Sequence, residues 1–363
     1  RSGRECELRT PMMRFRMTTA RKKLVDPTVT PFYHCISRCV RRALLCGEGH
    51  AYRKQWIETR LQELAGLFAI DVCGFSVMDN HLHVLLRLNL PQAKDWSAEE
   101  VARRWLALCP PRGVDLKPLK LTPTWIADRV QDVAWIAECR RRLGDLGWFM
   151  KFLKEPIARR ANKEDDCTGA FWEGRYRSIA ILDEASLLAT CAYIDLNPVA
   201  AGISATPEKS PHTSVKARVE HCAAQGQLER LREGSPYVSK AQFEKGHWLF
   251  PIEDKRDSNG RGLAGMLHGI SLTGYLQLLD WSSRLVRPGK AHVAAGAPPL
   301  LSRLQIDAAS WQVTLEKLFS GTKKVGSYFG TSHRLADLAE QQGRRFLKNL
   351  TGRQVALGTP NAS

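Results

Sequence analysis

Two apolar, β-rich segments separated by a short polar turn constrain the fold of this chain most strongly. Residues 70–78 (IDVCGFSVM) and 81–88 (HLHVLLRL) are rich in β-branched, aromatic and aliphatic side chains, and Asp79-Asn80 between them is typical of a tight turn. Two such runs with so short a connection favour an antiparallel hairpin. The sequence therefore predicts a sheet in which these two strands are neighbours.

The rest of the N-terminal half supplies further elements for this sheet. Residues 31–40 (PFYHCISRCV) read as another strand, and the apolar spacing over 51–68 predicts a helix. Residues 171–178 read as a loop or strand rich in aromatic residues and arginine. Asn197-Pro198 is expected to end a helix over 183–196. Further helices are expected over 98–108, 132–143, 148–162, 272–284, 310–318 and 332–350.

Composition along the chain predicts three parts. Residues 1–28 read as a basic N-terminal arm, and residues 29–203 as the main domain with a helical insertion at about 91–147. After Gly202, clusters of Pro, Ser, Gly and charged residues alternate with helical segments, so residues 204–363 read as a mostly helical accessory region.

The charge balance points to a polyanionic partner. The 363 residues include 54 Lys and Arg against 37 Asp and Glu, a formal net charge of +17. Such an excess attracts nucleic acid and raises its encounter rate. A basic membrane-surface protein fits less well, because the N-terminus has no basic amphipathic helix.

Localisation is expected to be cytoplasmic, at the bacterial nucleoid. No apolar run approaches the ~20 residues needed to cross a bilayer, and Arg1–Lys23 lacks the apolar core of a secretory signal. The 10 cysteines include no C-x2-C pair. They are expected to be reduced packing thiols.

The sharpest local feature is His81-Leu82-His83. In a strand, alternate side chains share a face, so the two imidazoles project together while Leu82 faces the other side. Two neighbouring imidazoles can chelate one cation. Their position in an otherwise apolar strand has a cost unless something uses them. The spacing therefore makes His81 and His83 candidate metal ligands.

Four segments together resemble the REP-associated tyrosine transposases, relatives of the IS200/IS605 single-tyrosine transposases. The segments are YHCISR (33–38), GFSVMDNHLHVLL (74–86), FWEGRYRS (171–178) and AYIDLNPVAAGI (192–203). The resemblance covers about residues 30–203. It implies an α+β fold with an antiparallel sheet flanked by helices, a HUH fold with a ferredoxin- or RRM-like core.

The resemblance also implies a function. In that family, two histidines and a polar helix residue hold Mg²⁺ or Mn²⁺, and a helix tyrosine attacks single-stranded DNA near a hairpin. Carried over by motif, His81, His83 and Asn162 would be the metal ligands. The partner would be single-stranded or hairpin DNA, the process DNA transposition, and the assembly a homodimer. Mn²⁺ suits imidazole better than Mg²⁺ does.

The family tyrosine is missing from its expected helix. Its two positions fall on Ile157 and Arg160, and no tyrosine occurs between Tyr52 and Tyr176. Three interpretations stay open: Tyr176 or, after it, Tyr193 substitutes; the alignment by spacing is displaced; or the protein binds DNA and metal without a covalent link. Tyr193, between apolar helix residues, is predicted to be a core residue. An RNA-binding module is a further alternative.

Basic and aromatic residues around these motifs are candidates for DNA contact, since phosphates need cations and unpaired bases stack on aromatic rings. Glu173 and Asp195 are expected to form salt bridges or helix caps rather than to assist at a metal. Arg140–Arg142 in the insertion read more readily as solvated surface. The candidate DNA-binding residues are Arg38, Arg41, Arg42, Arg159, Arg160, Trp172, Arg175 and Arg177.

Overall fold

The computed structural model describes residues 24–115, 117–120, 122–234, 243–256, 259–260, 262–286, 301, 306–320 and 326–350. Most of the expected N-terminal arm lies outside these residues. The main sheet has five strands in the order β2-β3-β1-β4-β7, and only the β4–β7 pair among them is parallel. The α+β class, with a mostly antiparallel sheet flanked by helices, is confirmed. The strands are β1 (Phe32–Arg38), β2 (Ile70–Val77), β3 (His81–Leu88), β4 (Arg177–Ile181) and β7 (Tyr328–Phe329).

The predicted hairpin is present. Strands β2 and β3 pair antiparallel, with Val77 opposite Leu82 at the turn. Strand β1 pairs with β3 on one side and β4 on the other, so the histidine-bearing strand lies inside the sheet. The segment 171–178 contributes only its end to β4, which begins at Arg177.

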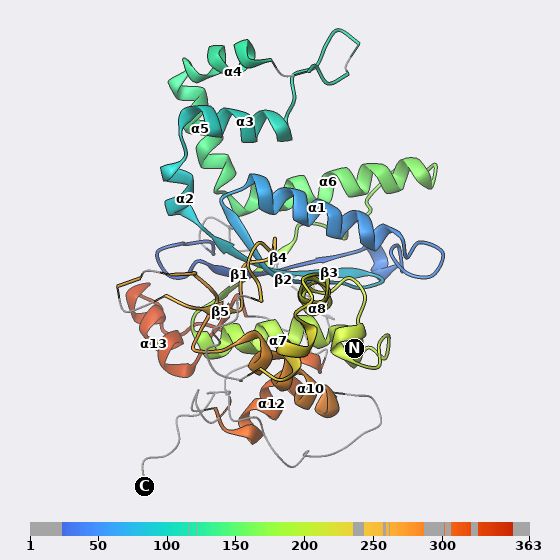
Figure 1. Cartoon of the computed structure of the whole chain (residues 1–363), viewed down its shortest axis with the longest axis vertical. Helices are drawn as coiled ribbons and strands as arrows, with labels where there is room; N and C mark the ends of the chain where they lie inside the picture. Colours follow the sequence, from blue (N-terminus) through green and yellow to red (C-terminus); the bar gives the residue numbers. More distant parts are fainter. Residues whose placement is uncertain are drawn as a thin grey trace, which may run out of the picture.

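The two faces of the sheet are covered by different helices (Figure 1). Helices α1 (Arg53–Leu67) and α6 (Leu146–Glu164) cover one face, where they share a core with Leu82 and Val84 of β3. The opposite face carries α7 (Glu184–Ala200), and Leu85 belongs to the core on that side. Because side chains alternate along β3, His81 and His83 lie on the α7 face.

The insertion forms a small helical unit that extends beyond α1 and α6 (Figure 1). It has its own apolar cluster, which includes Val101, Trp105, Ile136 and Leu143. Arg141 and Arg142 form ion pairs with Glu138 within one helix, as surface residues do. The helices of this unit are α2 (Leu90–Asp95), α3 (Ala98–Leu108), α4 (Pro123–Val130) and α5 (Val133–Leu143).

The expectation that Asn197-Pro198 ends a helix is wrong. Helix α7 continues to Ala200, with Pro198 inside its last turn. A proline there removes a single N–H, while its fixed φ suits a helix. Its carbonyl accepts a hydrogen bond from the N–H of Ile203 at 2.8 Å, which closes the end of the helix. Asn197 therefore belongs to α7 rather than to a following loop.

The C-terminal region packs onto α7 and also extends the main sheet through β7. Helices α8, α10 and α12 lie on the α7 side (Figure 1). Helix α13 ends at Gln341, earlier than expected, and Gly343 follows with a left-handed φ of 61° that a helix cannot continue. The remaining elements are η2 (Val40–Arg42), η3 (Pro207–Lys209), α8 (Ser214–Ala224), α9 (Leu228–Arg232), β5 (Glu253–Asp254), β6 (Leu267–His268), α10 (Leu272–Val286), α12 (Ala308–Phe319) and α13 (Ser332–Gln341).

The cysteines in the described part of the chain are free thiols, as expected. Most are buried, whereas Cys109 and Cys167 are exposed. The buried thiols fill space in the cores, and none of the cysteines in the described residues cross-links the chain.

Asp195 ties α7 to the C-terminal helices. Its Oδ1 accepts hydrogen bonds from the Ser214 hydroxyl at 2.6 Å and the Val215 N–H at 2.9 Å, at the start of α8. Its Oδ2 accepts one from the Tyr275 hydroxyl of α10 at 2.6 Å. Asp195 is thus a buried cap and anchor, in line with the expected capping role.

Replacing Asp195 with alanine is expected to destabilise the protein. The change leaves two buried donors, Val215 N–H and Tyr275 O–H, without an acceptor, at a cost of about 2–4 kcal/mol in the free energy of unfolding. Urea unfolding followed by circular dichroism measures this. Asp195→Asn keeps an oxygen acceptor and should cost less. A loss under about 0.5 kcal/mol for Asp195→Ala would show that the anchor contributes little.

Candidate active site

The side chains of three adjacent strands that face α7 include two histidines and two arginines near one end of the sheet. Arg38 of β1 lies opposite His81 of β3 in the register, and Ile36 lies between His83 on one side and Arg177 on the other. All of these positions share a face by strand alternation. The sheet therefore brings the predicted ligands His81 and His83 together with Arg38 and Arg177.

His81 is held as a neutral imidazole. Its Nδ1 lies 2.6 Å from Oδ1 of Asn80, whose Nδ2 donates to the carbonyl of Arg42 at 3.2 Å. The amide oxygen can only accept, so Nδ1 of His81 is the donor. Burial, aided by the charge of Arg38, lowers the pKa of His81 to about 4. At neutral pH the Nε2 lone pair of His81 is therefore not protonated.

His83 lies deeper and is only 2% exposed. Its ring centroid lies 4.9 Å from that of His81, in an edge-to-face arrangement. Its Nδ1 lies 2.9 Å from Nε2 of His34, a buried residue of β1 on the same face of the sheet. Both candidate ligands thus have Nδ1 engaged within the protein, which leaves Nε2 as the nitrogen for a cation.

Helix α7 places Tyr193 and Asn197 over these histidines. The ring centroid of Tyr193 lies 5.3 Å from that of His83, edge to face. Asn197, one helical turn further along, donates its Nδ2–H to the backbone carbonyl of Tyr193 at 3.1 Å, and its side chain lies near enough to His81 to act against the lowering of the pKa of that imidazole. Burial raises the pKa of Tyr193, while Asn197, Arg38 and Arg177 act in the opposite direction. Tyr193 packs against the core, as expected, and its ring also lies beside His83.

The donor set fits a divalent cation. His81 and His83 carry imidazole nitrogens, and Asn197 carries an amide oxygen on the adjacent helix, beside His81. Two nitrogens and one oxygen, with further oxygens from a phosphate or water, suit Mn²⁺ better than Mg²⁺. Binding needs neutral imidazoles, and the lowered pKa of His81 provides one.

The structure does not bring Asn162 into this group. Asn162 belongs to α6 on the opposite face of the sheet, and its Nδ2 donates to the carbonyl of Gly169 at 2.9 Å. The sheet separates it from His81 and His83. Asn162 therefore does not lie with His81 and His83, as the ligand set carried over from the family requires, whereas Asn197 of α7 lies beside His81.

Tyr176, the first substitute nucleophile considered, also lies away from the histidines. Its side chain is 6% exposed and belongs to the core on the α1 and α6 side. It directly precedes Arg177, which faces α7, so alternation turns Tyr176 to the other face. The assignment of Tyr176 as the nucleophile is corrected for the same reason as that of Asn162.

The predicted DNA-binding residues divide between the two faces. Arg38 and Arg177 lie with the histidines, and Arg177 donates to the carbonyl of Gly326 at 2.5 Å. Arg41 and Arg42 are exposed beside them, both with positive φ, 53° and 58°, a strained backbone often found near functional sites.

The other predicted DNA contacts are associated with α6. Arg160 lies 3.7 Å from the ring centroid of Trp56, and Arg159 pairs with Glu155. Trp172 donates its Nε1–H to the carbonyl of Lys154 at 3.0 Å, and Arg175 lines a shallow hollow of about 280 Å³ beside this helix. These residues are not part of the histidine site. Glu173 donates its backbone N–H to the carbonyl of Arg38 and thereby ties the end of β1.

Sequence reasoning missed His34 and Asn197, and it ranked Tyr193 behind Tyr176 as a substitute nucleophile. Two spacings in the sequence could have pointed to these residues. Tyr193 and Asn197 are four residues apart, which puts them on one helix face, provided that the helix passes Pro198. His34 and Arg38 are also an even number of residues apart on β1, as side chains on one strand face must be.

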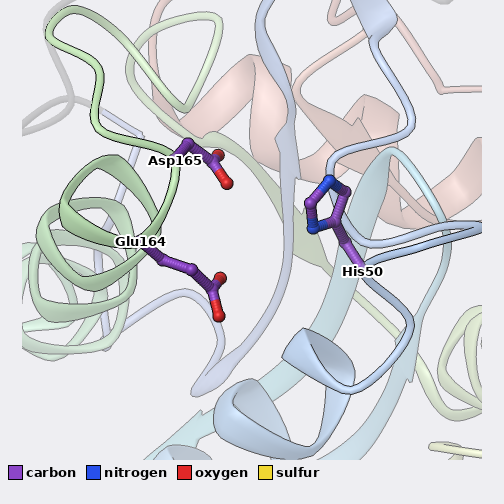
Figure 2. A group of neighbouring side chains, drawn as sticks. All are labelled: His50, Glu164 and Asp165. Atoms are coloured by element: carbon purple, nitrogen blue, oxygen red, sulfur yellow. The ribbon is translucent and has the colours of Figure 1, made fainter.

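A second group of candidate ligands lies at the C-terminal end of α6, where Glu164 and Asp165 face His50 (Figure 2). Their ligand atoms all lie within 4.8 Å of one another. Arg53, which is fully buried, forms ion pairs with both carboxylates. Its hydrogen bonds lower the pKa of Asp165 and help Tyr52 to lower that of Glu164. The guanidinium already supplies the positive charge, so this group is an ion-pair cluster.

Comparisons with known proteins add little to this geometry. No protein-family model matches the sequence, and no curated protein matches it. One similar solved structure is described as the REP-associated tyrosine transposase bound to a REP hairpin, at 12% identity and a TM-score of 0.31, covering 52% of this chain and 78% of that one. So low a TM-score carries no argument about function. Among the described residues, no helix is long and apolar enough to cross a bilayer.

Proposed function

We propose that this protein is a transposase-like, metal-dependent enzyme that cleaves and rejoins single-stranded DNA through Tyr193. The observation that carries the proposal is the position of Tyr193 on α7, against His83 and one turn before Asn197. A phenol, two imidazoles and an amide converge there, beside Arg38 and Arg177. A phenol on α7 would supply the nucleophile that α6 lacks, which favours cleavage over the alternative of a non-cleaving DNA-binding protein.

The proposed reaction is a transesterification. The Tyr193 oxygen bonds to a DNA phosphorus, and the bond from that phosphorus to the 3′ oxygen breaks. The phenol loses a proton and the leaving oxygen gains one, so the step needs no other reactant. His81, His83 and Asn197 would hold a divalent cation, which would polarise the phosphate and offset the charge that grows on it.

The flanking residues prepare Tyr193 for this step. Burial raises the pKa of its phenol, which by itself disfavours the nucleophilic phenolate. The positive charges of Arg38 and Arg177 favour the phenolate, and they also attract the phosphate. The reverse attack by the freed 3′ hydroxyl rejoins the strand, because the phosphotyrosine keeps the bond energy.

A covalent protein–DNA adduct tests the proposal. The full chain is incubated with Mn²⁺ and a labelled pool of oligonucleotides, each with a fixed hairpin flanked by random single-stranded sequence. Phosphotyrosine-linked DNA should migrate with the protein on a denaturing gel and should require the cation. A matched RNA pool distinguishes an RNA-binding module. Salt-dependent binding with no adduct across the pool would favour the non-cleaving DNA-binding alternative.

Arg38 and Arg177 are expected to contact phosphate in this complex. Replacing either with alanine should weaken binding of the DNA pool across all sequences, and should reduce the slope of log affinity against log salt by about 1. Fluorescence anisotropy over a salt series measures this slope. Arg103→Ala, at an exposed insertion residue paired with Glu99, serves as the control. If Arg38→Ala and the wild type had equal slopes of log affinity against log salt, Arg38 would not contact a DNA phosphate.

A further inference from the structure

His34 is a buried polar residue that makes direct contact with a proposed ligand. It lies on β1 with 1% of its surface exposed, and its Nε2 is 2.9 Å from Nδ1 of His83. The two rings are stacked, with centroids 5.1 Å apart and planes inclined by 28°. Burying an imidazole costs free energy unless its nitrogens form hydrogen bonds. The contact between His34 and His83 therefore offsets part of the cost of burying both rings.

If His83 binds a cation, only one of the two histidines can be the donor in the hydrogen bond between them. A neutral imidazole carries one proton, and the nitrogen that binds a metal must be the other one. With Nδ1 of His83 directed at His34, the metal-binding nitrogen is Nε2, and the proton belongs on Nδ1. His83 then donates and Nε2 of His34 accepts. A histidine's tautomer is set by the hydrogen bond of its second nitrogen.

The same arrangement occurs at His81, with a different partner. There Asn80 Oδ1 accepts from Nδ1 at 2.6 Å, in a partly exposed turn. Water can replace the Asn80 oxygen at such a position. His34 lies beneath the sheet's covering helix and is almost fully buried, so water cannot readily take its place. Loss of the acceptor should therefore matter more at His83 than at His81.

We infer that His34 is a positioning residue, which holds His83 in the tautomer and orientation that offers Nε2 to a divalent cation. The inference rests on the proposed function, since it assumes that His83 is a ligand. Outer partners of this kind change metal affinity by about 10- to 100-fold when they are removed. His34 itself needs no contact with DNA or with the cation.

Two substitutions at His34 separate positioning from packing. His34→Leu fills the space without an acceptor, whereas His34→Gln retains an acceptor oxygen. Mn²⁺ binding to the full-length protein without DNA is measured by the electron paramagnetic resonance signal of free Mn²⁺. We expect His34→Leu to lower the Mn²⁺ affinity about 10- to 100-fold and His34→Gln to restore most of it. Cys35→Ala, at the adjacent buried position facing the other way, should leave Mn²⁺ affinity unchanged.

A second measurement reads the tautomer in the metal-free protein. Long-range proton–nitrogen spectra should show His83 protonated on Nδ1 in the wild type and in His34→Gln, and a shift toward Nε2 protonation in His34→Leu. The positioning role would be overturned if His34→Leu bound Mn²⁺ as tightly as the wild type, or if both His34 variants lost Mn²⁺ affinity equally. Neither result would contradict the formation of a Tyr193 adduct. No His83-dependent Mn²⁺ binding in the wild type would instead overturn the proposed metal site itself, and the role of His34 with it.

Discussion

Tyr193→Phe is expected to abolish the covalent adduct, with a loss on the order of a thousandfold or more. The substitution removes only the hydroxyl and retains the ring, which contacts His83 and Phe319. The fold and Mn²⁺ binding should therefore be almost unchanged. Adduct formed on the hairpin pool, quantified on a denaturing gel, measures the effect.

Tyr176→Phe is the matched control for this experiment. Tyr176 has the same phenol, but it is buried in the core on the opposite face of the sheet, whereas Tyr193 is partly buried. Its substitution should leave the adduct at the wild-type level. If Tyr176→Phe removes the adduct and Tyr193→Phe does not, the face assignment of the nucleophile is wrong.

The second large effect concerns the ligands on the α7 face. His81→Ala and His83→Ala each remove one of the proposed ligands, so Mn²⁺ affinity should fall by more than about 100-fold, beyond the usual effect of losing an outer partner. Asn197→Ala should also weaken Mn²⁺ binding, though less, because a water oxygen can replace an amide oxygen. Calorimetric titration of the full chain with Mn²⁺ measures each affinity.

Asn162→Ala is the control that separates the two possible ligand sets. Asn162 and Asn197 are both helix asparagines, but only Asn197 contacts His81. Asn162→Ala should bind Mn²⁺ as the wild type does. A large loss of Mn²⁺ affinity in Asn162→Ala, with none in Asn197→Ala, would restore the set inferred from the family resemblance.

Local features of the sequence were sufficient for the β2–β3 hairpin, for several of the helices and for placing the two histidines on one face. The turn at Asp79-Asn80 joins β2 to β3 as expected. His81 and His83 share a face because strand alternation depends only on neighbouring residues. The insertion was visible as helical segments, and it forms helices with their own apolar cluster.

Helix ends were less predictable. The wrong end predicted for α7 left Asn197 outside the helix and so outside the candidate site. Asn197-Pro198 resembles a helix stop, but α7 continues through it because a proline in the last turn removes a single hydrogen bond. That additional turn places Asn197 on the same helix face as Tyr193. A local rule about proline thus gave the wrong end, and the pair four residues apart was overlooked.

The sequence by itself determined that two imidazoles project from one face of a buried strand in a strongly basic chain. Only the tertiary structure decided which helix meets them. The motif order favoured α6 with Asn162, yet α6 packs against Leu82 and Val84, and α7 covers the histidines. Which face a helix covers depends on how the chain crosses the sheet and on the order β2-β3-β1-β4-β7, and both are set by contacts between residues far apart in sequence.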